Sequence, residues 1–145
     1  MKTHYTVGFL FSFDKQKVAL IRKNRPDWQK GRLNGVGGHV EANETALQCM
    51  GREFGEEVEY PSLFKTEWRQ FATLESPQFI MDCFTSLGDL SSIKAKTDED
   101  IEVVSVDQIN PLRTKDMIEN LPWLISMAID FIEDGRPASA YVKYE

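Results

Sequence analysis

The chain has few of the residues that build the simplest metal and redox centres. Among its 145 residues are two cysteines, Cys49 and Cys83, and two histidines, His4 and His39. The cysteines form no CxxC pair, which excludes the usual zinc-ribbon and disulfide frameworks. We therefore expect two reduced, buried thiols, which suits a cytoplasmic protein.

Long apolar runs and an excess of basic charge are also missing. No stretch approaches the roughly 18 apolar residues that a membrane-spanning helix needs, and the N-terminal residues show no export-signal pattern. The net charge is −6, so there is no basic footprint for duplex nucleic acid. We expect no membrane or duplex partner, although an acidic protein can still bind phosphates through a divalent cation.

What is present fits one domain over residues 1–145. Runs of β-branched and aromatic residues predict strands, and apolar residues at helical spacing predict two helices. The expected strands cover residues 5–13, 18–22, 63–74, 79–87 and 101–106, and the expected helices cover 44–57 and 121–133. The first two strands, joined by a polar turn, should form a hairpin. This order predicts an α+β fold with a mixed sheet flanked by helices.

The limits and buried face of the first helix can also be predicted. We expect Asn43 to cap it, and its apolar residues at helical spacing should face the core: Ala46, Leu47, Met50 and Phe54. Residues 91–100 are polar and charged and should form a surface loop, and the residues from 135 onward should form a tail.

Three glutamates near the end of the first expected helix carry the chemical information. Glu53, Glu56 and Glu57 lie at i, i+3 and i+4, so they project from one face. Three like charges at the negative end of a helix destabilise it. A bound Mg²⁺ removes that penalty, because hard cations prefer carboxylate oxygens and share their coordination with substrate phosphates. A solvated acidic face is the plainer interpretation of the three glutamates alone.

Residues around the acidic cluster fit the same purpose. Arg52 precedes it, and its planar guanidinium can hold a carboxylate with two hydrogen bonds. Glu44 lies about 80° away around an ideal helix, close enough to be that partner. Gly37 and Gly38 would let the backbone approach a metal ion or a phosphate closely.

The whole segment resembles the Nudix box, the signature of the Nudix hydrolase family. Gly38, Glu44, the Arg52-Glu53 pair and the Glu56-Glu57 pair stand at the spacing of that motif, with Phe54 at its bulky apolar position. The resemblance implies an α/β/α sandwich and cleavage of a diphosphate bond in a nucleoside diphosphate linked to a further group. It also implies a Mg²⁺ or Mn²⁺ ion held by Glu53, Glu56, Glu57 and the carbonyl of Gly38. Glu44 and Arg52 would orient these ligands, and Glu57 or Glu53 would deprotonate the attacking water.

Two positions depart from the motif. Glu59 stands where the family has a glycine that ends the helix in a left-handed turn, and Tyr60 stands at a position that is usually aliphatic. A non-glycine residue in such a turn costs about 1 kcal/mol. The departure therefore bears on the exit of the helix and leaves the expected metal ligands intact.

Residues elsewhere resemble the MutT-like branch of the family, which cleaves purine nucleoside triphosphates, including oxidised ones. Asn34, before Gly35, corresponds to an asparagine that contacts the base, although an asparagine before glycine is also a common turn residue. Trp123 opens the last helix, where it could stack on a base or lie in the core. Arg22 and Lys23 end the second strand and could hold phosphates.

Other substrates and roles stay open at this stage. Enzymes of the family that cleave ADP-ribose or sugar nucleotides form one alternative, and a Nudix domain that binds nucleotides without hydrolysis forms another. Glu99 or Asp100 could add an acid to the metal site, since the MutT-like branch often has one there; a solvated charge run is the plainer interpretation. The oligomeric state cannot be predicted from the sequence.

Overall fold

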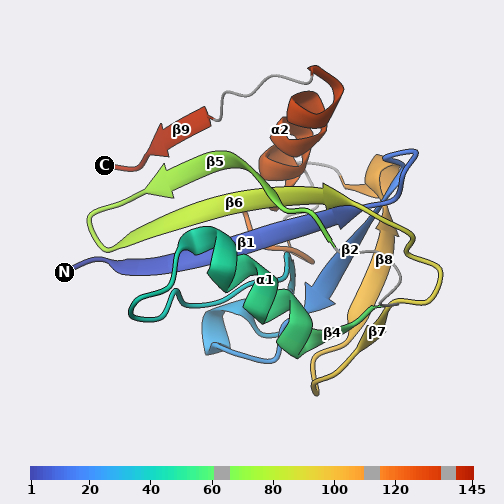
Figure 1. The fold of residues 1–145 in the computed structure, drawn as a ribbon, viewed down its shortest axis with the longest axis horizontal. Coiled ribbons are helices and arrows are strands. Elements are labelled where there is room, and N and C mark those ends of the chain that lie inside the picture. The colour runs from blue at the N-terminus through green and yellow to red at the C-terminus, as the bar shows by residue number, and fades with distance from the viewer. Residues whose placement is uncertain (61–65, 110–114, 135–139) are drawn as a thin grey trace.

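The computed structural model describes residues 1–60, 66–109, 115–134 and 140–145, which form a mixed sheet covered by helices (Figure 1). The strands are β1 Thr3–Phe11, β2 Lys17–Arg22, β3 Leu33–Asn34, β4 Val58–Glu59, β5 Arg69–Glu75, β6 Phe79–Leu87, β7 Lys94–Ala95, β8 Ile101–Ser105 and β9 Ala140–Lys143. The helices are α1 Ala46–Glu57 and α2 Leu121–Asp134, with the short 3-10 helices η1 Asp27–Gln29 and η2 Val106–Gln108.

The main sheet is built around β1 and β6, which pair in parallel along their whole length. Its order is β3-β2-β1-β6-β5-β9, and β8 also pairs with β2. The expected hairpin between the first two strands is confirmed, and β5 and β6 form a second antiparallel pair. β4 and β7 make a separate two-stranded sheet beside the C-terminal end of α1 (Figure 1).

Alternate side chains of β1 divide between two hydrophobic cores, as the pleat of a strand requires. Phe9 and Phe11 pack in the core that includes Leu124 of α2. Leu10 belongs to the other core, together with Met50 of α1. One helix therefore covers each face of the sheet, which confirms the expected mixed sheet flanked by helices.

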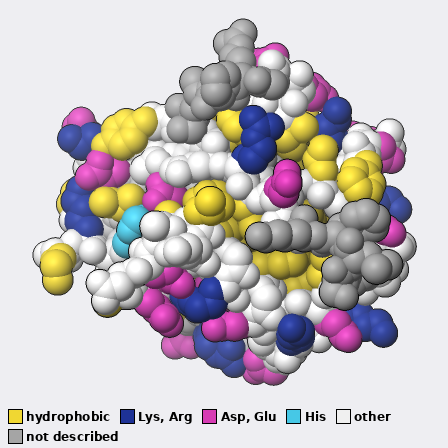
Figure 2. Space-filling model, viewed as in Figure 1, with side chains coloured by type: hydrophobic (Ala, Val, Ile, Leu, Met, Phe, Trp, Pro, Cys, Tyr) yellow, Lys and Arg dark blue, Asp and Glu magenta, His cyan; other side chains and the backbone are white. Residues whose placement is uncertain are grey.

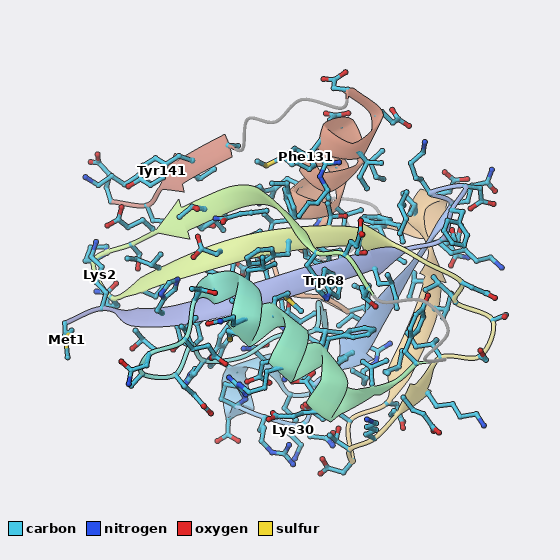
Figure 3. All side chains as sticks on the ribbon, viewed as in Figure 1. Met1, Lys2, Lys30, Trp68, Phe131 and Tyr141 are labelled. Carbon is cyan, nitrogen blue, oxygen red and sulfur yellow. The ribbon has the colours of Figure 1, made fainter. Side chains whose placement is uncertain are left out.

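Aromatic pairs join the helices to the sheet on both faces (Figure 3). Trp68 packs edge-on against Phe54 of α1 with ring centroids 5.3 Å apart. Phe131 of α2 packs against Phe71 of β5 at 6.5 Å. Such pairs fix the position of each helix beyond what burial alone provides.

The start of α1 differs from the expected one. The helix begins at Ala46, and Thr45 caps it: the Thr45 hydroxyl accepts from the Gln48 amide at 3.1 Å, and the Gln48 side chain accepts from the Thr45 amide at 2.9 Å. This capping box satisfies two backbone donors at once. Asn43, expected to be the cap, lies in the preceding turn with φ 66°, a conformation that asparagine tolerates.

The end of α1 shows why Glu59 can stand where the motif has a glycine. Val58 leaves the helix in an extended conformation, with φ −127° and ψ 124°, and the chain continues directly into β4. No left-handed residue is needed there, so a side chain at position 59 costs nothing. Within the helix, Met50 and Phe54 are buried as expected, whereas Leu47 is 53% exposed and Cys49 takes its place in the core.

Short strands were missing from the sequence-based expectation. β7 lies in the segment expected to be a polar loop, and β9 lies in the expected tail, where it pairs in parallel with β5. The strand expected over 63–74 starts at Arg69, and residues 63–65 lie outside the described part of the chain. Within the described ranges, no helix has the length and hydropathy needed to cross a membrane.

Candidate active site

The loop between β3 and α1 runs alongside β1, which holds Gly38 against the sheet. The Thr6 amide donates to the Gly38 carbonyl at 2.9 Å, and Gly8 and Val36 exchange two backbone hydrogen bonds at 2.6 and 3.0 Å. A Cβ on Gly37 would lie 2.0 Å from the Thr6 carbonyl oxygen. Only glycine permits this approach, so the position of the Gly38 backbone depends on its neighbour.

Gly38 lies directly against the carboxylate of Glu53. A Cβ on Gly38 would lie 2.4 Å from Glu53 Oε1 and 2.8 Å from Glu53 Oε2. The Glu53 side chain is 15% exposed, so its carboxylate is held between the helix and this loop. The backbone of the loop and the Glu53 carboxylate are therefore in direct contact.

Arg52 connects the loop to the acidic face of α1. Its Nε and Nη2 donate to the two oxygens of Glu44 at 2.7 and 3.0 Å, the paired geometry expected from the sequence. Its Nη2 also donates to the His39 carbonyl at 3.1 Å, and its Nη1 donates to Glu53 at 3.1 Å and to Glu56 at 3.2 Å. The guanidinium lowers the pKa of Glu44 to about 2, so Glu44 stays charged and keeps Arg52 in place.

Glu57 occupies a different environment from its neighbours. Its side chain is half-buried, and its Oε2 is shielded from water with no hydrogen-bond partner among the described residues. Burial raises the pKa of Glu57 to about 8; Lys23 acts in the opposite direction, while Glu53 and Glu99 raise it further. A buried carboxylate oxygen without a partner is costly, which marks this position as one that a bound group would satisfy.

Glu99 is the second buried acid at the site. It is 6% exposed, accepts from the Asn24 amide at 2.6 Å and pairs with Lys23 Nζ at 3.1 Å. Asp100, the alternative expected from the sequence, is exposed. Of the two acids, Glu99 is therefore the one whose charge acts on Glu57.

A cavity of about 350 Å³ adjoins these groups. Gly38 and His39 line it from the loop, and Lys23 lines it while also acting on Glu57. The remaining lining residues are Tyr5, Thr6, Val7, Pro26, Trp28, Gln29, Asn34, Gly35, Gly37, Phe79, Met81, Ile118 and Asn120. Gly38 and Lys23 thus connect the cavity to the carboxylates, because Gly38 lies against Glu53 and Lys23 acts on Glu57.

Asn34 presents an oriented amide to this cavity. Its Nδ2 donates to Gln29 Oε1 at 3.0 Å, and its Oδ1 accepts from the Gly35 amide at 2.8 Å. Each end of the amide keeps one further hydrogen-bonding capacity. The side chain is therefore a turn residue and a possible base ligand at once, and these two interpretations of the sequence are compatible.

Two expected substrate residues lie elsewhere. Arg22 is engaged by Glu102 at 2.6 Å and by Asp116, which raise its pKa and leave its guanidinium committed to structure. Trp123 lies on the outer side of α2, 37% exposed, and is not among the described side chains that line the cavity. The aromatic residue that the sequence interpretation overlooked is Trp28, which does line it.

The residues that the motif implies for a metal ion are only partly assembled in this structure. No three acidic, histidine or cysteine side chains among them already converge on one point. Glu56, whose side chain is 58% exposed, pairs with Arg52 Nη1 at 3.2 Å. Glu53 nevertheless lies against the Gly38 backbone and acts on Glu57, whose buried Oε2 has no partner among the described residues. These oxygen donors fit a hard divalent cation, and Figure 2 shows acidic and basic side chains gathered on the face that α1 covers.

Comparison with known proteins agrees with the fold. The family model described as NUDIX domain matches residues 2–124. No curated protein matches the sequence.

Three solved structures illustrate the likeness. A NUDIX hydrolase from Nitrosomonas europaea is 18% identical over 99% of this chain and 80% of its own, with a TM-score of 0.69. A MutT from a study of Aliivibrio salmonicida and Vibrio cholerae is 21% identical over 90% of this chain and 100% of its own, with a TM-score of 0.70. A UDP-X diphosphatase is 17% identical over 97% of this chain and 67% of its own, with a TM-score of 0.63. At these identities the likeness shows the fold alone.

Proposed function

The chain belongs to the Nudix hydrolase family, and from that premise we propose that it hydrolyses a purine nucleoside triphosphate, canonical or oxidised, to the nucleoside monophosphate and pyrophosphate. The observation that carries the proposal is the unpartnered, buried Oε2 of Glu57 beside Glu53 and Gly38. A carboxylate kept in that state, next to a lysine that lines a nucleotide-sized cavity, suits a metal-dependent phosphoryl site.

Members of the family generally use a divalent metal ion, and we propose Mg²⁺ or Mn²⁺ here. Glu53, Glu56, Glu57 and the Gly38 carbonyl would hold it, with Arg52 releasing Glu56. When bound, such an ion lowers the pKa of the attacking water and neutralises charge on the diphosphate. Arg52, fixed by Glu44, positions the Glu53 carboxylate against Gly38.

The protein's own groups supply the remaining steps. Glu57 Oε2 is the oxygen best placed to accept a proton from water, because Glu53 Oε1 already accepts from Arg52. Water adds its hydroxyl to phosphorus, and the bond to the leaving pyrophosphate breaks. Lys23, between the cavity and Glu57, can pair with the phosphates in place of Glu99. Asn34 can bond the edge of the base from the cavity wall.

A substrate panel tests this assignment. Purified protein with Mg²⁺ is incubated with canonical and oxidised purine triphosphates, pyrimidine triphosphates, ADP-ribose, a UDP-sugar and a dinucleoside polyphosphate, and the products are separated by ion-exchange chromatography. We expect pyrophosphate and a monophosphate from a purine triphosphate. Cleavage of ADP-ribose or the UDP-sugar alone would reassign the substrate, and binding without cleavage would make the domain a nucleotide-binding one.

A further inference from the structure

Trp28 stands out among the residues that line the cavity. Its side chain is 64% exposed, and its indole N–H has no hydrogen-bond partner among the described residues. The chain's other two tryptophans are placed differently: Trp68 is 8% exposed inside a core, and Trp123 is on the outer side of α2. Single exposed aromatics are common, so the position at the cavity is what gives Trp28 its interest.

The segment that carries Trp28 is pinned at its base. The Lys23 amide donates to the Arg32 carbonyl at 2.9 Å, and the Gly31 amide donates to the Lys23 carbonyl at 2.8 Å. Within the loop, Gln29 ties η1 to Asn34 through the side-chain hydrogen bond of 3.0 Å. Lys30, two residues after Trp28, marks the place of this loop in Figure 3. The backbone that carries the indole is therefore fixed beside the cavity before any ligand arrives, which reduces the entropic cost of binding.

A second aromatic surface lines the same cavity from the sheet and the glycine-rich loop. Tyr5 packs edge-on against His39 with centroids 4.6 Å apart and against Phe79 at 6.4 Å. These three rings support one another, whereas Trp28 has no ring contact among the described side chains. The cavity therefore combines a rigid aromatic wall with one unpartnered indole at its edge.

We propose that Trp28 is a specificity-determining residue that stacks on the nucleobase of the substrate. The inference rests on the proposed function, because it assumes that the substrate binds with its phosphates next to the carboxylates and its base in the cavity. A planar heteroaromatic ring can cover the exposed indole face, and a purine offers the larger surface. Asn34, tied to the same loop through Gln29, would meet the edge of that ring.

The test separates the base from the phosphates. Binding of guanosine 5′-(α,β-methylene)triphosphate, which resists hydrolysis at that bond, is measured by calorimetry with Mg²⁺ and compared with tripolyphosphate, which has no ring. Trp28→Ala is expected to raise the Kd of the nucleotide roughly tenfold and to leave that of tripolyphosphate unchanged. Trp28→Phe should bind almost as the wild type does, and Trp123→Ala, the matched exposed control, should change neither ligand.

Fluorescence gives a second signature. The nucleotide should quench wild-type emission, and the quench should be lost in Trp28→Phe although that variant still binds. Thermal unfolding shows whether each variant is folded, which is expected because Trp28 is exposed. The inference is overturned if Trp28→Ala binds the nucleotide as the wild type does, if both ligands weaken equally, or if wild type binds the nucleotide no more tightly than tripolyphosphate.

Hydrolysis of GTP is measured in parallel so that the two failures can be told apart. If wild type turns over GTP and Trp28→Ala changes neither KM nor Kd, the stacking role is refuted and the proposed function remains supported. If nucleotide binding depends on Trp28 but no triphosphate is turned over, the proposed function is refuted and the stacking role is supported.

Discussion

Replacing Glu57 by glutamine should stabilise the metal-free protein as the pH rises. The folded-state pKa of Glu57 is raised above its ordinary value of 4.5 to about 8, chiefly by burial. Between those two values the native state binds more protons than the unfolded state, so wild-type stability falls with increasing pH. Glutamine carries no charge to desolvate, so Glu57→Gln escapes this loss.

The size of the effect follows from the same interval. Each pH unit corresponds to 1.36 kcal/mol, so the interval from 4.5 to about 8 sets a ceiling of about 5 kcal/mol. The effective dielectric constant of buried sites is higher than that of a dry interior, and we expect about 2 kcal/mol. For a chain of this size that gain raises Tm by about 4 to 8 °C.

Calorimetry in EDTA, repeated across pH 5 to 9, measures this difference. The Tm of Glu57→Gln minus that of wild type should be small at the acidic end and should grow through the interval. Glu59→Gln, an exposed acid on β4, is the matched control and should show no such trend. If this difference in Tm stays constant with pH, or if Glu57→Gln is less stable than wild type at every pH, burial does not raise the pKa of Glu57 as proposed. With Mg²⁺ added the order should reverse, because wild type keeps every proposed ligand and gains more stability from the ion than the variant does.

Three further predictions concern the surroundings of Glu57. Gly38→Ala should remove most activity with little loss of stability, because its Cβ meets the end of the Glu53 side chain, which can shift. Gly37→Ala should unfold the protein, because its Cβ meets the backbone of Thr6. Thermal melts and rate assays distinguish the two outcomes. Arg52→Lys should raise the Mg²⁺ concentration for half-maximal rate by roughly tenfold or more, since one ammonium cannot reproduce the paired bonds that hold the carboxylates. Asn34→Ala should raise KM for a purine triphosphate more than for a pyrimidine one, measured by initial rates.

The Arg52→Lys prediction has a matched control variant, and the other two predictions each have a result that would contradict them. Arg25→Lys changes an ion pair with Asp98 in which both side chains are 62% exposed, and it should leave metal dependence and stability unchanged. Full activity of Gly38→Ala would contradict the contact with Glu53. Equal increases of KM for both base types in Asn34→Ala would leave that residue a turn former.

The parts of the site that follow from local spacing could be predicted from the sequence. Arg52 and Glu44 pair as the motif implies, although Glu44 lies in the turn before the helix, which begins at Ala46. On an ideal helix, residues eight positions apart would be separated by about 12 Å along the axis, so the turn is what brings Glu44 back to Arg52. The Thr45 cap was also readable, since a threonine followed three positions later by glutamine is a capping-box pattern. Asn43 was a weaker choice because it lacks that partner.

The parts that depend on distant pairing could not be predicted. Arg22 looked available for phosphates, but its partners Glu102 and Asp116 are 80 and 94 positions away. β9 has four residues, and only its register with β5 makes it a strand. Trp28 reads locally as part of a polar loop, and only the folded chain shows the cavity beside it.

The role of Glu57 and a divalent ion is tested most directly by measuring pyrophosphate release from a purine triphosphate while Mg²⁺ is titrated. Wild type, Glu57→Gln and Glu59→Gln are compared side by side. We expect Mg²⁺-dependent turnover by wild type and Glu59→Gln. A folded Glu57→Gln should have a rate lower than that of wild type by orders of magnitude. Equal rates for the two variants, or turnover that persists in EDTA, would contradict the claim that Glu57 and a divalent ion form the centre of this site.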